Sequence, residues 1–143
     1  MKALKSILLV FAALAVTCAS ALAGGGVKVI ANPSVKADSI SAAELKSVFL
    51  EETNSLRDGS HVEPVLAKGG AAHQAFLKDY LGKNQAALQA YYRSLVFTGK
   101  GTMPKTLGSE AEVAAYVAKT KGAVGYVSEG TSAEGAKTLR VKQ

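Results

Sequence analysis

One segment, which encodes a helix with a defined start and a tight turn after it, constrains the fold of this chain more than any other. Ser41 and Glu44 have the spacing of a capping box, which satisfies free N–H groups at a helix start. We therefore expect an amphipathic helix over about 41–50, followed by a turn at 57–59 and a strand. The apolar stripe of this helix contains Leu45, Val48 and Phe49.

The first 23 residues have the three parts of a secretory signal peptide. Lys2 and Lys5 form a positive start, residues 7–16 form an apolar run, and Ala21–Ala23 is a small-residue cleavage site. An apolar run of about ten residues is too short for a membrane span, which needs roughly 20. We expect export, with cleavage near Ala23, and a periplasmic or secreted protein.

Cys18 is the only cysteine of the chain. It lies in the predicted signal, so it is either lost with the signal or serves as a lipidation site, although Ala15-Val16-Thr17 fits a lipidation motif poorly. If cleavage follows Ala23, no cysteine remains for a disulfide or a metal site. An exported protein without disulfides must be stabilised by its core.

Residues 24–143 have the length of one domain. Loss of Lys2 and Lys5 lowers the formal net charge from +6 to +4, and the remaining basic residues are scattered among acidic ones. No basic run with interleaved aromatic residues occurs, which argues against a nucleic-acid partner. A mildly positive surface would suit an anionic solute or the negative envelope, but solvated lysines are the default explanation.

Predicted strands and helices alternate along this domain, with two helices consecutive in the middle. This order predicts an α/β fold in which a small mixed sheet is flanked by helices. Pro64 lacks an N–H group, so we expect its strand at a sheet edge or a bulge. Strands are expected over 27–31, 61–67, 123–127 and 138–141, and helices over about 41–50, 71–81, 84–98 and 109–119. Asn84 can cap the third of these helices, and Ser109 with Glu112 forms a second capping box.

The helix that follows Asn84 has the strongest helical periodicity of the chain. Its apolar residues recur at i, i+3, i+4, i+7 and i+8, which predicts one buried face. This stripe consists of Leu88, Tyr91, Tyr92, Leu95 and Val96.

Several short motifs, taken in order, resemble the second lobe of phosphate-type periplasmic solute-binding proteins. Val29–Pro33 resembles the family's Ile-Val-Asn-Pro strand, and Leu95–Gly99 resembles its Val-Phe-Ser-Gly segment. Gly122–Val127 is similar to Gly-Ala-Ile-Gly-Tyr-Val, and the helix over 41–50 matches the family's Leu…Ile-Phe helix. The resemblance implies a single-lobe periplasmic-binding-protein-like domain, whereas family members that trap a solute have two lobes.

The family's anion loop falls on Lys68-Gly69-Gly70-Ala71-Ala72-His73. In the family, a basic residue and Gly-Ser-Gly-Thr open a helix, so that hydroxyls and backbone N–H groups meet phosphate. Here Gly70 stands where the serine falls and Ala72 where the threonine falls, so both hydroxyls are missing. The backbone N–H groups and the Lys68 charge remain as candidate anion contacts. The alternative is that the glycines only form a turn. If the loop binds phosphate, Gly70→Ser should tighten binding.

No catalytic, cofactor or metal site can be assembled from the sequence. His61 and His73 are the only histidines, too few for a three-ligand metal site without carboxylates. His73 is expected to be a surface or helix-packing histidine, and not a ligand or base. We expect no enzyme. Two functions remain: a solute-binding-like protein for phosphate or another oxyanion, with a membrane permease as candidate partner, and a scaffold that serves only as an interaction module for an envelope partner.

Overall fold

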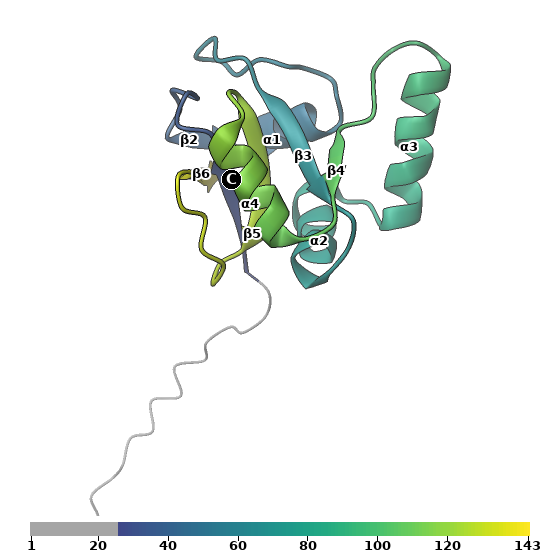
Figure 1. The fold of residues 1–143 in the computed structure, drawn as a ribbon. Coiled ribbons are helices and arrows are strands. Elements are labelled where there is room, and N and C mark those ends of the chain that lie inside the picture. Colours follow the sequence, from purple (N-terminus) through teal and green to yellow (C-terminus); the bar gives the residue numbers. More distant parts are fainter. Residues whose placement is uncertain (1–25) are drawn as a thin grey trace, which may run out of the picture.

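The structure is a computed structural model that describes residues 26–143, and the predicted signal over 1–23 lies outside them. A six-stranded mixed sheet forms its centre (Figure 1). The strands are β1 (Val27–Ala31), β2 (Ser39–Ser41), β3 (Glu63–Ala67), β4 (Lys105–Leu107), β5 (Ala123–Ser128) and β6 (Lys137–Lys142). The helices are α1 (Ala42–Phe49), α2 (Ala71–Phe76), the π-helical turn η1 (Leu77–Leu81), α3 (Gln85–Phe97) and α4 (Glu110–Lys119).

The strand order is β2-β6-β1-β5-β3-β4, and both parallel and antiparallel pairs occur. Strand β1 pairs antiparallel with β5 and β6, whereas β3 runs parallel to β5 and to β4. Ala67, the last residue of β3, is level with Leu107, the last residue of β4. The connections that leave these two strands therefore start side by side. The predicted mixed sheet flanked by helices is confirmed.

Helices cover both faces of the sheet, and the core lies between them and the strands. Successive residues of β5 show the two faces: Gly125 faces α4, whereas Tyr126 lies against Phe76 of α2, with ring centroids 4.0 Å apart. An ideal Cβ on Gly125 would lie 2.8 Å from Val113 of α4, so only glycine permits this close packing. Figure 1 shows α4 across the front of the sheet.

Side-chain caps fix the start of three helices, as the sequence predicts. The Ser41 hydroxyl accepts a hydrogen bond from the N–H of Glu44 at 3.1 Å, and Asn84 caps α3 through the N–H of Ala87 at 2.8 Å. The second half of the first capping box is wrong, because the Glu44 carboxylate instead accepts from the N–H of Arg57 at 2.7 Å. Glu44 thus ties α1 to the turn rather than to its own cap.

Two further expectations fail for physical reasons. Of the two places expected for Pro64, the sheet edge is wrong, since β3 lies between β5 and β4. Proline is tolerated there because β4 pairs with β3 only from Val65 onward. The missing N–H group of Pro64 therefore breaks no hydrogen bond to β4. The apolar stripe of α3 is buried only in part, because Val96 at its end is 51% exposed. Among the described residues, no helix has the length and apolar character of a membrane span.

Candidate functional site

The candidate site lies where β3 ends and α2 begins. Residues 64–67 are buried within the sheet, and the chain emerges at Lys68, whose N–H still donates to the Leu107 carbonyl at 2.9 Å. Gly69 and Gly70 then turn the chain into α2. Gly70 has φ 99° and ψ 169°, a conformation that side chains other than hydrogen strongly disfavour. Glycine is therefore required for this turn.

The start of α2 has no side-chain cap. Gly70 occupies the N-cap position, and no side chain accepts from the first N–H groups of the helix. The first hydrogen bond of the helix runs from the N–H of Gln74 to the Gly70 carbonyl, four residues earlier, at 3.1 Å. The N–H groups of residues 71–73 precede the first such bond, so a helix leaves them without an intrahelical partner. These donors carry the positive end of the helix dipole.

The turn is open to solvent. Residues 68–71 are exposed, and no atom lies within 4 Å of an ideal Cβ on Gly69 or Gly70. The one ion pair among the described residues joins Lys137 to Asp38, so the Lys68 ammonium is not neutralised by a salt bridge. Open space, uncapped N–H groups and one lysine therefore meet at this turn.

The other two candidate residues turn their side chains inward. Ala72 is 2% exposed and His73 is 3% exposed. His73 Nε2 lies 2.5 Å from Gln85 Oε1, and its Nδ1 contacts the Tyr126 hydroxyl. Since the amide oxygen only accepts, Nε2 carries the proton and Nδ1 accepts from Tyr126. The His73 side chain is thus a helix-packing group, and it is not offered to a ligand at the turn.

Tyr126 of β5 holds the turn in place from within the core, a role that the sequence did not indicate. Its hydroxyl accepts from the N–H of Ala67 at 3.1 Å and contacts His73, so it joins the end of β3 to α2. Burial raises the pKa of the Tyr126 phenol, and this outweighs the opposing hydrogen bond from Ala67. The Gly-Tyr-Val segment resembles that of phosphate-type solute-binding proteins and indicated this strand. No local sequence pattern indicates that the Tyr126 hydroxyl contacts the end of β3 and α2.

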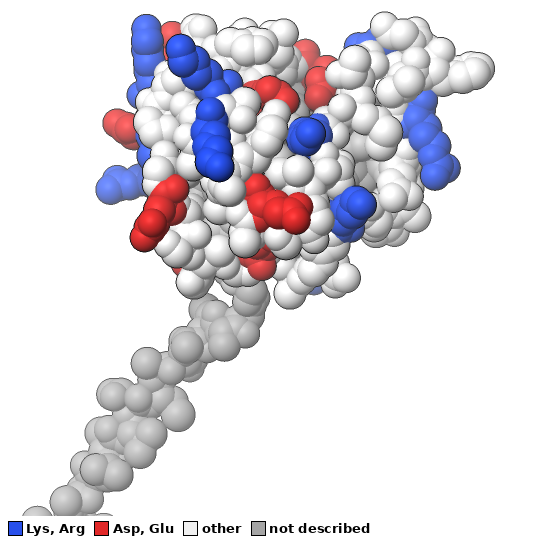
Figure 2. Space-filling model, viewed as in Figure 1, with Lys and Arg blue, Asp and Glu red and all other residues white. Residues whose placement is uncertain are grey.

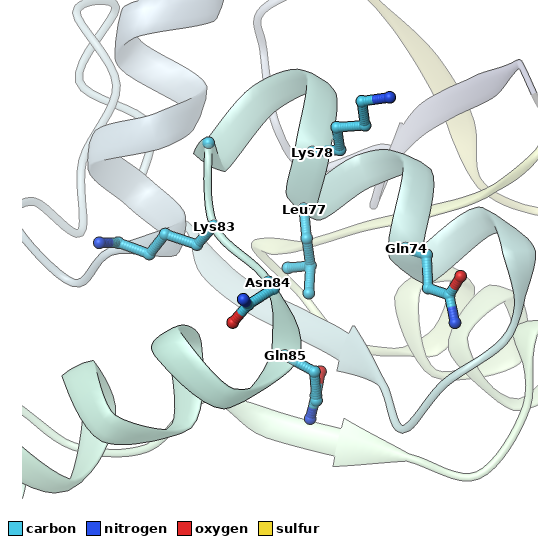
Figure 3. A pocket seen from close by; sticks show the side chains of 7 residues that line it. Gln74, Leu77, Lys78, Lys83, Asn84 and Gln85 are labelled. Carbon is cyan, nitrogen blue, oxygen red and sulfur yellow. The ribbon is translucent and has the colours of Figure 1, made fainter.

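A pocket of about 570 Å³ opens beside α2, between η1 and the start of α3. Figure 3 shows Leu77 reaching from η1 toward the start of α3, whereas the Lys78 and Lys83 side chains extend to opposite sides. Its lining has five uncharged residues and two lysines, so any charge for an anion there would come from Lys78 and Lys83. Among residues 26–143, no three His, Cys, Asp or Glu side chains are grouped so that they could hold a metal ion.

Comparison with solved structures places this fold beside phosphate-binding transport proteins. An ABC-type phosphate transport receptor from Vibrio cholerae superposes with a TM-score of 0.61 and 10% identity, covering 82% of this chain and 46% of that chain. PstS from Borrelia burgdorferi gives a TM-score of 0.62 and 13% identity, covering 83% of this chain and 48% of that chain. Identities this low show a likeness of fold alone.

The chain thus spans about half the length of the proteins that it resembles. No family model matches its sequence. No curated protein matches it either. The likeness to a single lobe of a periplasmic-binding-protein fold therefore rests on structure.

Proposed function

We propose that this chain is an exported, non-catalytic, single-lobe solute-binding-like protein that takes phosphate or another oxyanion at the start of α2. The observation that carries the proposal is the uncapped, exposed turn at Gly70. Unlike the other three α-helices, α2 begins without a side-chain oxygen on its first N–H groups. An anion from solution would satisfy those donors and meet the dipole of the helix.

In this proposal the backbone does most of the binding. The N–H groups around residues 70–72 donate to the oxyanion, and Lys68 adds a positive charge from the end of β3. The hydroxyls of the related loop are absent, and no second lobe within residues 26–143 excludes water from the turn. Exposed charges are screened by solvent, so we expect weak, salt-sensitive binding.

Calorimetric titration of residues 24–143 with inorganic phosphate tests the proposal. Lys68→Ala should weaken binding about tenfold, the loss expected for one charge-assisted contact. Lys121→Ala is the matched control, because it removes the same charge from an exposed residue just before β5, at the opposite end of β3. Equal weakening by both variants, or no heat at millimolar phosphate, would refute the proposed site.

The structure changes which serine variant is informative. Gly70→Ser would force a side chain into the conformation with φ 99°, so strain obscures any gain from its hydroxyl. Gly69 has no positive φ and has free space around its Cβ position. Gly69→Ser should therefore leave the fold intact and tighten phosphate binding if the turn is the site.

The second candidate function is an interaction module that retains only the scaffold and contacts an envelope partner. The observation that favours it is an exposed apolar cluster at the end of α3, away from the Gly70 turn. A membrane permease remains a candidate partner under the first function. Saturable phosphate binding that depends on Lys68 would favour solute binding over the scaffold-only alternative.

A further inference from the structure

Helix α3 stands apart from the rest of the fold (Figure 1). It has no extensive contact with any other helix or strand, and only Leu88 and Tyr92 along it are buried. Two tyrosines attach it to the end of α1: Tyr91 donates to the Leu50 carbonyl at 2.7 Å and Tyr92 to the Phe49 carbonyl at 2.5 Å. The C-terminal turn of α3 lies beyond these attachments.

That turn and the loop after it carry three exposed large apolar residues, which we call the α3 tip. Phe97 is 92% exposed, and Val96 and Met103 are 51% and 54% exposed. These are the large apolar side chains that the described part of the chain leaves most open to water. Large apolar residues that are exposed within one short segment are typical of an interaction surface.

The segment that carries the α3 tip is itself basic, and the nearest acidic residue, Glu51 of the turn after α1, lies beside Gly101. From Tyr80 to Ser109 the sequence has no Asp or Glu, and two of its basic residues, Arg93 and Lys100, flank the tip in the chain. The other two lie elsewhere: Lys83 precedes the start of α3, and Lys105 lies over the Tyr116 ring of α4. Figure 2 shows blue side chains and no red ones over α3. A protruding apolar group beside several basic side chains is complementary to a surface that is apolar inside and anionic outside.

We propose that the α3 tip docks on a lipid bilayer that contains anionic phospholipids. Phe97, Val96 and Met103 would enter the boundary between headgroups and acyl chains, while Lys100 and Arg93 stay with the lipid phosphates. A second copy of the chain is a poorer occupant, because two acid-free α3 segments would bring like charges together. A protein interface needs about 800 Å² per partner, so an envelope protein would have to cover residues beyond these three side chains.

The test uses residues 24–143, which contain the whole sheet and core and lack the apolar leader. Vesicles of equal parts phosphatidylglycerol and phosphatidylcholine are compared with pure phosphatidylcholine by flotation. Binding to the anionic vesicles should fall with rising salt. Phe97→Ser should lower the partition coefficient about tenfold, since Phe burial in an apolar phase is strongly favourable. It should not unfold the protein, because the side chain is already exposed.

Matched variants separate specific docking from general attraction. Lys100→Glu should reduce binding at least tenfold. Lys142→Glu makes the same charge change on β6, next to the edge strand at the far side of the sheet from β4, and should reduce binding less. Ala87→Ser on an exposed part of α3 should have no effect. Equal loss with Lys100→Glu and Lys142→Glu, or no preference for anionic vesicles, would overturn the proposal. So would a dimer in sedimentation velocity that Phe97→Ser dissociates, since the tip would then bind a second copy.

Discussion

Two strand-to-helix connections start side by side on this sheet, but only one of them leads to a helix with a side-chain cap. After β4, the Ser109 hydroxyl accepts from the N–H of Glu112 at 3.2 Å, and the Glu112 carboxylate accepts from the N–H of Gly108 at 2.9 Å. After β3, Gly70 starts α2 with no side-chain cap. The α4 start is completed by the chain itself, whereas the α2 start retains free donors. Topology creates both helix starts, and a side-chain cap distinguishes them.

The largest expected effect compares the close packing of β5 against α4 with the open turn before α2. Gly125→Ala should lower the free energy of unfolding by about 2–3 kcal/mol, because its Cβ would lie 2.8 Å from Val113 and 3.1 Å from Val117 of α4. Gly69→Ala at the open turn should change it by less than about 0.5 kcal/mol. Urea unfolding of both variants measures the difference. Similar values for the two would show that the turn is as closely packed as the α4 side.

A smaller effect is expected for the hydroxyl that supports the open turn. Tyr126→Phe removes the acceptor of the Ala67 N–H and the partner of His73, both buried. Leaving buried polar groups unsatisfied should cost about 1–2 kcal/mol of unfolding free energy. Amide hydrogen exchange at Ala67 should accelerate as well. An unchanged stability with unchanged exchange would mean that the turn is held without Tyr126.

The smallest of these effects tests the closed start. Ser109→Ala should destabilise the protein by about 1 kcal/mol, since α4 loses its N-cap acceptor. Ser94→Ala, inside α3 and exposed, is the matched control and should change stability by less than about 0.5 kcal/mol. If Ser109→Ala behaves like Ser94→Ala, the cap contributes little and the contrast with α2 loses its energetic basis.

Local signals predicted much of this fold. Caps at Ser41, Asn84 and Ser109 gave the helix starts correctly, because a cap involves residues only three apart. Strands β2 and β4 were missed because each has three residues, too few for a period to register. Their positions depend on pairing with β6 and β3, which are distant in sequence.

The candidate site was predictable in its backbone but not in its surroundings. The glycine pair indicated an unusual turn, and the structure gives Gly70 a positive φ. The role of Tyr126 was hidden, since it lies 59 residues from Ala67 and reaches it only through sheet pairing. The exposure of Val96 and Phe97 was hidden as well. Periodicity shows that a helix has an apolar face, but not whether the fold supplies anything to cover it.

The central claim is that the start of α2 is free to receive an oxyanion while the start of α4 is not. Amide chemical shifts of residues 24–143, followed by nuclear magnetic resonance during titration with phosphate at constant ionic strength, test it directly. We expect saturable shifts at the N–H groups of Gly70, Ala71 and Ala72, and none at Glu112. Shifts that are equal at both helix starts, or absent from the α2 start at millimolar phosphate, would contradict the account.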